Sequence, residues 1–165
     1  MTKETYLKMT ESFRGNPKRQ KAIILIDSIL TKIAYIAYPV LLAALYLQKD
    51  TGLARAVLVP GISFVVISVF RYLYCAPRPY EVFDLPPVIP KDTRGKSFPS
   101  RHVFSIFIIG MTFFWKMPLA GVLIGAAGIF MAVVRVLGGV HFPKDVIAGA
   151  ALGILAGLVG FYWIP

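Results

Sequence analysis

The sequence predicts an all-α protein, a multi-pass bundle of about five transmembrane helices preceded by an N-terminal interfacial helix. Of its 165 residues 57% are hydrophobic and 16% are charged, and the mean hydropathy is +0.70. Soluble domains are about 45–50% apolar. The apolar residues also fall in long blocks, which a chain of this length cannot bury in one packed interior. Lipid must therefore cover much of this surface.

The first 21 residues are polar and basic, and they lack the apolar core and cleavage site of a secretion signal. Tyr6, Met9 and Phe13 recur at helical spacing, and Pro17 is expected to end the segment. This pattern predicts a short helix on the membrane surface, with a solvated irregular segment as the alternative. We divide the chain into this segment, 1–21, and a transmembrane domain, 22–165.

Five apolar runs follow, each bounded by charge, proline or glycine. A helix of about 20 residues crosses the hydrocarbon core at 1.5 Å per residue. The first run contains Asp27 and Lys32 and is long enough to tilt or to emerge at one end. The third run is long enough only if its helix begins near Pro99. The runs are 22–47, 53–74, 103–115, 118–136 and 146–164.

The connections between these runs are unequal in length. The segments 48–52 and 116–117 are tight turns, whereas 75–98 is a proline-rich connection of 24 residues. A loop of this length usually has a function or is disordered. If the chain crosses the membrane at each run, this loop, the 137–145 connection and the N-terminus share one face.

Glycines repeat every four residues in the last two runs, at Gly121 and Gly125 and again at Gly149, Gly153 and Gly157. Small residues at this spacing let helix backbones approach closely, so we interpret them as packing positions. Asp145 lies one step before Gly149 on the same stripe. Its carboxylate is therefore expected to face the bundle interior.

The charge balance is strongly basic, with 18 Lys and Arg against 8 acidic residues. Such a balance suits anionic lipid headgroups or an anionic substrate. Nucleic acid is excluded as a partner because most of this surface lies in hydrocarbon and the basic residues collect in short connections. Cys75 is the only cysteine, so no intrachain disulfide is possible.

The two histidines, His102 and His141, lie at the mouths of predicted helices on the shared face. Arginine residues lie near both histidines in the sequence. Guanidinium is planar, permanently charged and matched to phosphate oxygens by its paired donors. Hydroxyl and backbone donors at a helix N-terminus also favour an anion. The pattern predicts a phosphate site that includes Arg71, Arg78, Ser100 and Arg135.

The spacing of His141 and Asp145 fits a nucleophile and its orienting carboxylate. Pro143 favours the first helical turn, which brings residues four apart to one side of the helix entrance. A carboxylate on one ring nitrogen fixes the tautomer and leaves the other free to attack phosphorus. His102 is then the candidate general acid for the leaving oxygen of a lipid phosphate.

These residues form three motifs that resemble the type 2 phosphatidic acid phosphatases, the PAP2 superfamily. Arg78 and Pro79 follow a cation seven residues earlier. Pro99, Ser100 and His102 form the second motif, and Arg-x5-His-x3-Asp over 135–145 forms the third. The order and the positions at helix ends both match. Bacterial phosphatidylglycerophosphate and undecaprenyl diphosphate phosphatases belong to this superfamily.

The resemblance implies catalytic roles for His141, His102 and Asp145 and a phosphohistidine intermediate on His141. It also adds the amide of Arg101 to the phosphate site and implies no cofactor and no metal. Arg71 stands where lysine is common, Arg101 where glycine is common, and Val134 where serine often occurs. The chain is also one helix shorter than the six common in the family.

Three alternatives compete with a lipid phosphatase. The histidines and Asp145 could bind zinc, but the arginines would repel a cation. A haloperoxidase would use the same pocket with vanadate, although a membrane-spanning chain suits an amphiphilic substrate better. A membrane anion-binding or transport protein without turnover is the third.

The sequence leaves three lipid substrates open: phosphatidic acid, phosphatidylglycerophosphate and undecaprenyl diphosphate. It also leaves the oligomeric state open. We expect a multi-pass protein of the cell membrane. Basic residues of 1–21 and 75–98 outnumber those on the opposite side, and this bias favours a cytoplasmic active-site face.

Overall fold

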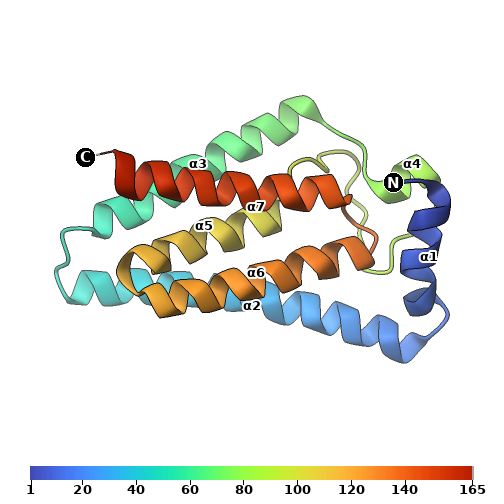
Figure 1. The fold of residues 1–165 in the computed structure, drawn as a ribbon, viewed down its shortest axis with the longest axis horizontal. Coiled ribbons are helices and arrows are strands. Elements are labelled where there is room, and N and C mark those ends of the chain that lie inside the picture. The colour runs from blue at the N-terminus through green and yellow to red at the C-terminus, as the bar shows by residue number, and fades with distance from the viewer. Residues whose placement is uncertain (165) are drawn as a thin grey trace.

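A computed structural model describes residues 1–164; Pro165, the last residue of the predicted 22–165 domain, lies outside this range. The described chain is helical, and its long helices run roughly side by side (Figure 1). The helices are α1 (Lys3–Arg14), α2 (Pro17–Leu47), α3 (Leu53–Tyr74), α4 (Pro79–Phe83), α5 (Arg101–Lys116), α6 (Pro118–Leu137) and α7 (Pro143–Leu158), which a π-helical turn (Val159–Trp163) extends.

The prediction of a multi-pass helical bundle is confirmed. Within residues 1–164, four helical stretches are long and apolar enough to cross a membrane, one fewer than the five expected. The difference is α5, which begins at Arg101 rather than near Pro99 and has 16 residues. At 1.5 Å per residue it extends about 24 Å, less than the hydrocarbon core of about 30 Å.

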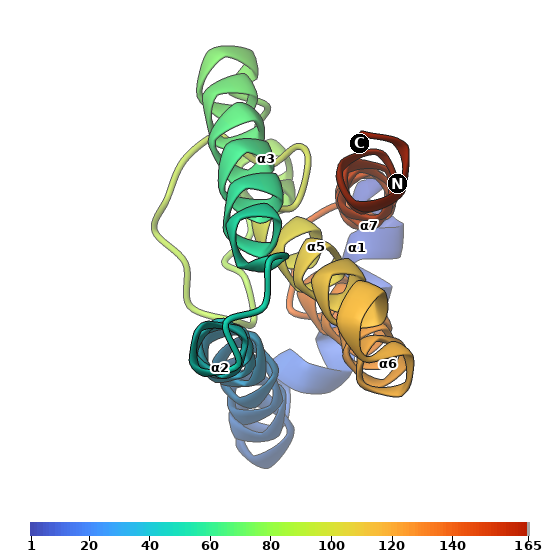
Figure 2. The same cartoon turned by 90° about the vertical axis from the view of Figure 1, so that its left-hand side faces the viewer.

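Helix α5 forms the centre of the bundle, with α6 and α7 packed closely against it (Figure 2). The glycines of α7 face it: a Cβ at Gly149 would lie 2.7 Å from the Ser100 carbonyl oxygen, and one at Gly153 would lie 2.8 Å from that of Phe104. Only glycine permits this approach. A Cβ at Gly125 would meet nothing within 4 Å, so this glycine has no packing role of that kind.

Prolines inside α2 and α3 leave backbone carbonyls without their helical donors. Pro60 cannot donate to the carbonyl of Ala56. The Tyr38 hydroxyl of α2 donates to that oxygen instead, over 2.8 Å. In lipid an unsatisfied carbonyl is costly, so this bond both satisfies α3 and ties it to α2.

The N-terminal segment forms helix α1, so the irregular alternative is wrong. Thr2 caps the helix by accepting a hydrogen bond from the Thr5 amide at 3.2 Å. Tyr6 is buried, and its hydroxyl donates to the carbonyl of Gly139 at 3.2 Å. Helix α1 therefore lies crosswise over the end of the bundle (Figure 1). Its position at a membrane surface stays a prediction.

The polar connections share one end of the molecule, as predicted. Helices α1 and α4, the chain from 75 to 100 and the 138–142 connection all lie there (Figure 1). The opposite end holds the turns from α2 to α3 and from α5 to α6, where Lys116 Nζ pairs with Asp50 Oδ1 at 2.7 Å.

Candidate active site

A polar cavity of about 330 Å³ opens at the end that holds the polar connections. It brings together side chains from α3, α5, α6 and the two connections. Six of its lining residues are Lys or Arg, and no lining residue is acidic, which is the composition expected for binding an anion. The lining consists of Ser68, Arg71, Tyr72, Arg78, Lys91, Thr93, Lys96, Arg101, His102, Arg135 and His141.

His141 and Asp145 lie together, as their spacing predicted. His141 lies two residues before α7, which begins at Pro143, and its Nδ1 is 3.6 Å from Asp145 Oδ2. Asp145 is fully buried, and its Oδ2 accepts hydrogen bonds from the Phe142 amide at 3.0 Å and from Ser97 Oγ at 2.5 Å. Ser97 Oγ is also 3.5 Å from His141 Nδ1. The carboxylate is thus fixed behind the ring, and Nε2 is the nitrogen left for a ligand.

The environment of His141 favours its neutral form. Burial lowers the pKa of the imidazole to about 4. The interaction with Asp145 opposes this shift, and the positive charge of Arg78 reinforces it. Desolvation disfavours the charged imidazolium. A neutral imidazole has a free lone pair at neutral pH, which a nucleophile requires.

Two arginines of the cavity are held by the backbone of the 75–100 connection. Arg71 donates to the carbonyls of Lys96, Ser97 and Pro99. Arg78 Nε donates to Gly95 O at 3.0 Å, and its Nη1 donates to Val140 O at 3.1 Å. The long connection therefore folds around the two guanidinium groups and fixes them at the cavity wall.

Glu81 of α4 also holds the long connection in place. Its carboxylate accepts hydrogen bonds from the Arg78 amide and from the Gly95 amide, each at 2.8 Å. Gly95 has a φ of +62°, and a Cβ there would lie 2.6 Å from Cys75 Sγ. The loop therefore turns tightly at this glycine and returns to the cavity.

Arg135 has a different partner, the carboxylate of Asp27. Its Nε is 2.9 Å from Asp27 Oδ1, and both side chains are largely buried. Asp27 lies on α2 and Arg135 near the end of α6. Charged groups within apolar helices are costly unless paired, so this ion pair links the two helices and orients the guanidinium beside the cavity.

We predict that Asp27→Asn lowers kcat/KM by about 10- to 100-fold, the range that corresponds to losing a hydrogen bond to a charged group. The amide removes the charge that holds Arg135 while keeping the shape of the side chain. Steady-state kinetics of phosphate release measures the effect. Asp50→Asn is the matched control, because it breaks an ion pair at the opposite end of the bundle.

A double-mutant cycle distinguishes an effect of Asp27 on the orientation of Arg135 from an effect on the stability of the whole protein. If Asp27 acts through Arg135, adding Asp27→Asn to Arg135→Ala costs little more than Arg135→Ala alone. Fully additive losses, or an equal loss in Asp50→Asn, would contradict a positioning role for Asp27.

The second predicted motif is only partly in the cavity. Arg101 and His102 line it, whereas Ser100 is fully buried and is not among the lining residues within 1–164. The Ser100 amide donates to the Asp145 carbonyl at 2.8 Å, and its Oγ has no hydrogen-bond partner in the described chain. In this structure Ser100 therefore joins α5 to α7 behind the site.

Sequence reasoning missed two residues that the structure places in contact with the site, Ser97 and Asp27. Asp27 carried a signal, because an acid inside an apolar run usually has a partner. Ser97 carried none: it lies in an irregular loop, and only the fold brings it to Asp145.

Comparisons with known proteins agree with this architecture. A family model described as the PAP2 superfamily matches residues 52–165. The chain is 29% identical over 143 residues to "Undecaprenyl-diphosphatase BcrC" of Bacillus subtilis (strain 168), covering 82% of this chain and 74% of that protein. It is 30% identical over 128 residues to "Bacitracin transport permease protein BcrC" of Bacillus licheniformis, covering 75% of this chain and 63% of that protein.

A solved structure has the same fold. The crystal structure of Aquifex aeolicus LpxE superposes with a TM-score of 0.73 over 95% of this chain and 92% of that one. At 20% identity this likeness shows the fold alone. Because the family model matches well over half of the sequence and contains all three motif regions, the chain belongs to the PAP2 superfamily.

Proposed function

We propose that this protein removes the terminal phosphate of a membrane lipid through a phosphohistidine intermediate on His141, without a metal ion. The observation that carries the proposal is the arrangement of His141, backed by buried Asp145, in a cavity lined by six basic side chains. Such a site combines a nucleophile with charge stabilisation for a phosphoryl group in transfer.

In the first step, the lone pair of His141 Nε2 forms a bond to phosphorus while the bond from phosphorus to the leaving oxygen breaks. That oxygen takes the electron pair, and His102 donates a proton to it. Burial and the neighbouring cations disfavour the protonated imidazole in the free protein, and the negative charge of the bound phosphate stabilises it. Asp145 stabilises the positive charge on the imidazole. Arg71, Arg78 and Arg135 neutralise the phosphoryl oxygens, with a further donor in the amide of Arg101.

In the second step, water attacks the phosphohistidine. His102, now without its proton, accepts one from the water as the new bond to phosphorus forms. The bond from phosphorus to Nε2 breaks, and its electron pair returns to His141. Inorganic phosphate leaves, and both histidines regain their starting protonation states.

The chain is a multi-pass membrane enzyme of a family that hydrolyses lipid phosphates. Its substrate is therefore amphiphilic, with the phosphate in the polar cavity and the hydrocarbon in or beside the bundle. The name of the Bacillus subtilis relative favours undecaprenyl diphosphate among the three candidate lipids. Phosphate release from each candidate by purified protein in detergent distinguishes among them.

Metal independence is tested in the same assay. We expect EDTA to leave the rate unchanged and vanadate, a phosphate mimic, to inhibit. The physical reason is that six cations around the cavity repel a metal ion, and residues 1–164 contain no cluster of three or more His, Cys, Asp or Glu that could bind one. Loss of activity with EDTA that zinc restores would contradict the proposal.

A transport or anion-binding function without turnover is the second candidate, and the name of the Bacillus licheniformis relative favours it. The same basic cavity would then hold an anion that is released unchanged. Phosphate release that is lost when His141 is replaced would show that the protein is an enzyme. Binding of a lipid phosphate without any release would decide for the alternative.

We propose further that the active-site end faces the cytoplasm, because basic residues concentrate there. Single cysteines in a Cys75→Ser background test this orientation. Exposed Asp92 lies at the active-site end, and exposed Thr51 lies at the opposite end. An impermeant thiol reagent added to intact cells is expected to label Thr51→Cys and spare Asp92→Cys. Labelling of Asp92→Cys alone would reverse the orientation. Besides Arg71, Arg78, Arg101, Arg135 and Lys144, the cations at the active-site end are Lys3, Lys8, Arg14, Lys18, Arg19, Lys21, Lys91, Arg94 and Lys96.

A further inference from the structure

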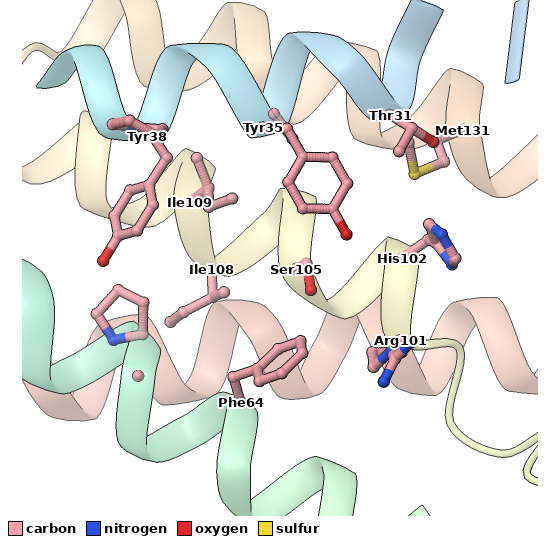
Figure 3. A pocket seen from close by; sticks show the side chains of 14 residues that line it. Thr31, Tyr35, Tyr38, Phe64, Arg101, His102, Ser105, Ile108, Ile109 and Met131 are labelled. Atoms are coloured by element: carbon pink, nitrogen blue, oxygen red, sulfur yellow. The ribbon is translucent and has the colours of Figure 1, made fainter. Parts of the chain in front are cut away.

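An apolar groove of about 280 Å³ lies between α2, α3 and α5. In Figure 3, Tyr35 and Tyr38 reach into it from α2, Phe64 approaches from α3, and Ile108 and Ile109 lie along α5. Exposed apolar side chains on α2 and α3 flank the groove, so its open side faces lipid.

The groove is continuous with the polar cavity. Arg101 and His102 line both, and Figure 3 shows them at one end of the groove. The groove extends along α5 from Arg101 to Ile109, eight residues or about 12 Å of helix. A lipid with its phosphate in the cavity would therefore pass its first chain segment past Arg101 and His102 into the groove.

Gly61 on α3 leaves this space open. It lines the groove, and a Cβ built on it would meet nothing within 4 Å. The groove closes near the prolines of α2 and α3, where the bond from Tyr38 to Ala56 joins the two helices. The groove therefore lies between α2 and α3, which are joined at one end by this hydrogen bond and separated at the other end by the phosphate site.

Arg101 occupies the junction and has no acidic partner within residues 1–164. Its guanidinium lies over the Phe64 ring, with 5.6 Å from Cζ to the ring centroid. By contrast, Arg135 is paired with Asp27, and Arg71 and Arg78 are bonded to loop carbonyls. The donors of Arg101 are therefore available on the chain side of the scissile phosphate.

We propose that the groove between α2, α3 and α5 binds the hydrocarbon chain of the substrate. Arg101 at its mouth binds the leaving group and thereby selects lipid diphosphates over lipid monophosphates. The inference rests on the proposed function. A monophosphate leaves as an alcohol, which bears little charge for a guanidinium to bind, whereas a diphosphate leaves as a lipid phosphate anion that matches it.

The step balances without a further reactant. His141 Nε2 bonds to the terminal phosphorus, and the bond from that phosphorus to the bridging oxygen breaks. The bridging oxygen takes the electron pair and a proton from His102, and the departing lipid monophosphate keeps negative charge on its other oxygens. Arg101 stabilises the negative charge that builds up on this leaving phosphate group, so it acts most strongly in the transition state.

Farnesyl diphosphate and farnesyl monophosphate test the role of Arg101, because they share one chain and differ by one phosphate. Arg101→Ala is expected to lower kcat/KM for the diphosphate by about 10- to 100-fold, the value of a charged hydrogen bond, and for the monophosphate far less. Arg101→Lys is expected to restore part of the preference. Equal losses on both substrates would overturn the selection role.

Filling the groove tests the chain site. Gly61→Phe, and the smaller Gly61→Leu, are expected to raise KM for both farnesyl substrates by about tenfold or more, since hydrophobic pockets discriminate on that scale. Hydrolysis of p-nitrophenyl phosphate, which has no chain, is expected to be unchanged. Gly125→Phe on α6 is the matched control, because that glycine also faces open space.

The outcomes separate the inference from the proposed function. If the wild-type protein releases phosphate from none of the three compounds, the proposed function fails. If it hydrolyses them and Gly61→Phe matches Gly125→Phe, the chain lies elsewhere. The shallow apolar surface of α3 around Val65 and Val69 is another apolar site next to the cavity. A rise in KM in Val65→Phe but not in Gly61→Phe would place the chain there.

Discussion

His141→Ala is expected to reduce phosphate release to the uncatalysed background, a loss of at least about 10⁴-fold. No other residue lining the cavity combines a lone pair with a carboxylate behind it, so replacing the imidazole would remove the proposed nucleophile. Release of phosphate from the lipid substrate measures the loss. His141→Asn is the informative companion, because its amide can still donate to Asp145 and keep that buried carboxylate satisfied.

Both variants are expected to be inactive while folded, as judged by thermal unfolding and by vanadate binding. Rapid quenching of the wild-type protein during turnover is expected to trap acid-labile, base-stable phosphate on His141. Label on a serine or an aspartate would contradict the assignment. Substantial activity in His141→Asn would show that the histidine only orients another group.

His102→Ala is expected to have an effect that depends on the leaving group. A general acid contributes about 10²–10⁴ in rate when the leaving oxygen is a poor one. For a lipid monophosphate, which expels an alcohol, the loss should reach that range. For p-nitrophenyl phosphate, which expels a stable phenolate, formation of the phosphohistidine should be almost unaffected.

The same variant is expected to accumulate the intermediate, because in the proposed mechanism His102 also activates the water of the second step. A burst of p-nitrophenol followed by slow turnover would report this, with the burst equal to the amount of enzyme. Comparable losses on both substrates, with no burst, would instead indicate that His102 binds the phosphate. Replacement of exposed Lys144 by Ala, close in sequence to the site but not in the cavity lining, is the control.

The helices were predictable because the bilayer imposes one rule on every segment that crosses it. An apolar run in the bilayer must form the hydrogen bonds of its own backbone internally, so the runs 53–74 and 118–136 are predicted to be helices. Helix α5 was the exception. Its 16 residues are too few for a span by themselves, and the structure places them at the centre of the bundle, where α6 and α7 cover them.

The candidate site also has a part that the sequence predicted and a part that it did not. His141, Asp145 and Arg135 lie within one short motif, and helical geometry brought the first two together as expected. Ser97 and Asp27 come from segments far away in the sequence, and their contacts with Asp145 and Arg135 depend on how the connection 75–98 and helix α2 pack.

The sequence by itself determined that this chain is a helical membrane protein, that its polar segments share one end, and which residues could handle phosphate there. Local patterns are sufficient for those conclusions because period, hydrophobicity and motif spacing act over a few turns of helix. Only the tertiary structure decided which arginine has an acidic partner, where Ser100 lies, and that an apolar groove meets the cavity at Arg101. Those features arise from contacts between segments tens of residues apart, which no local pattern encodes.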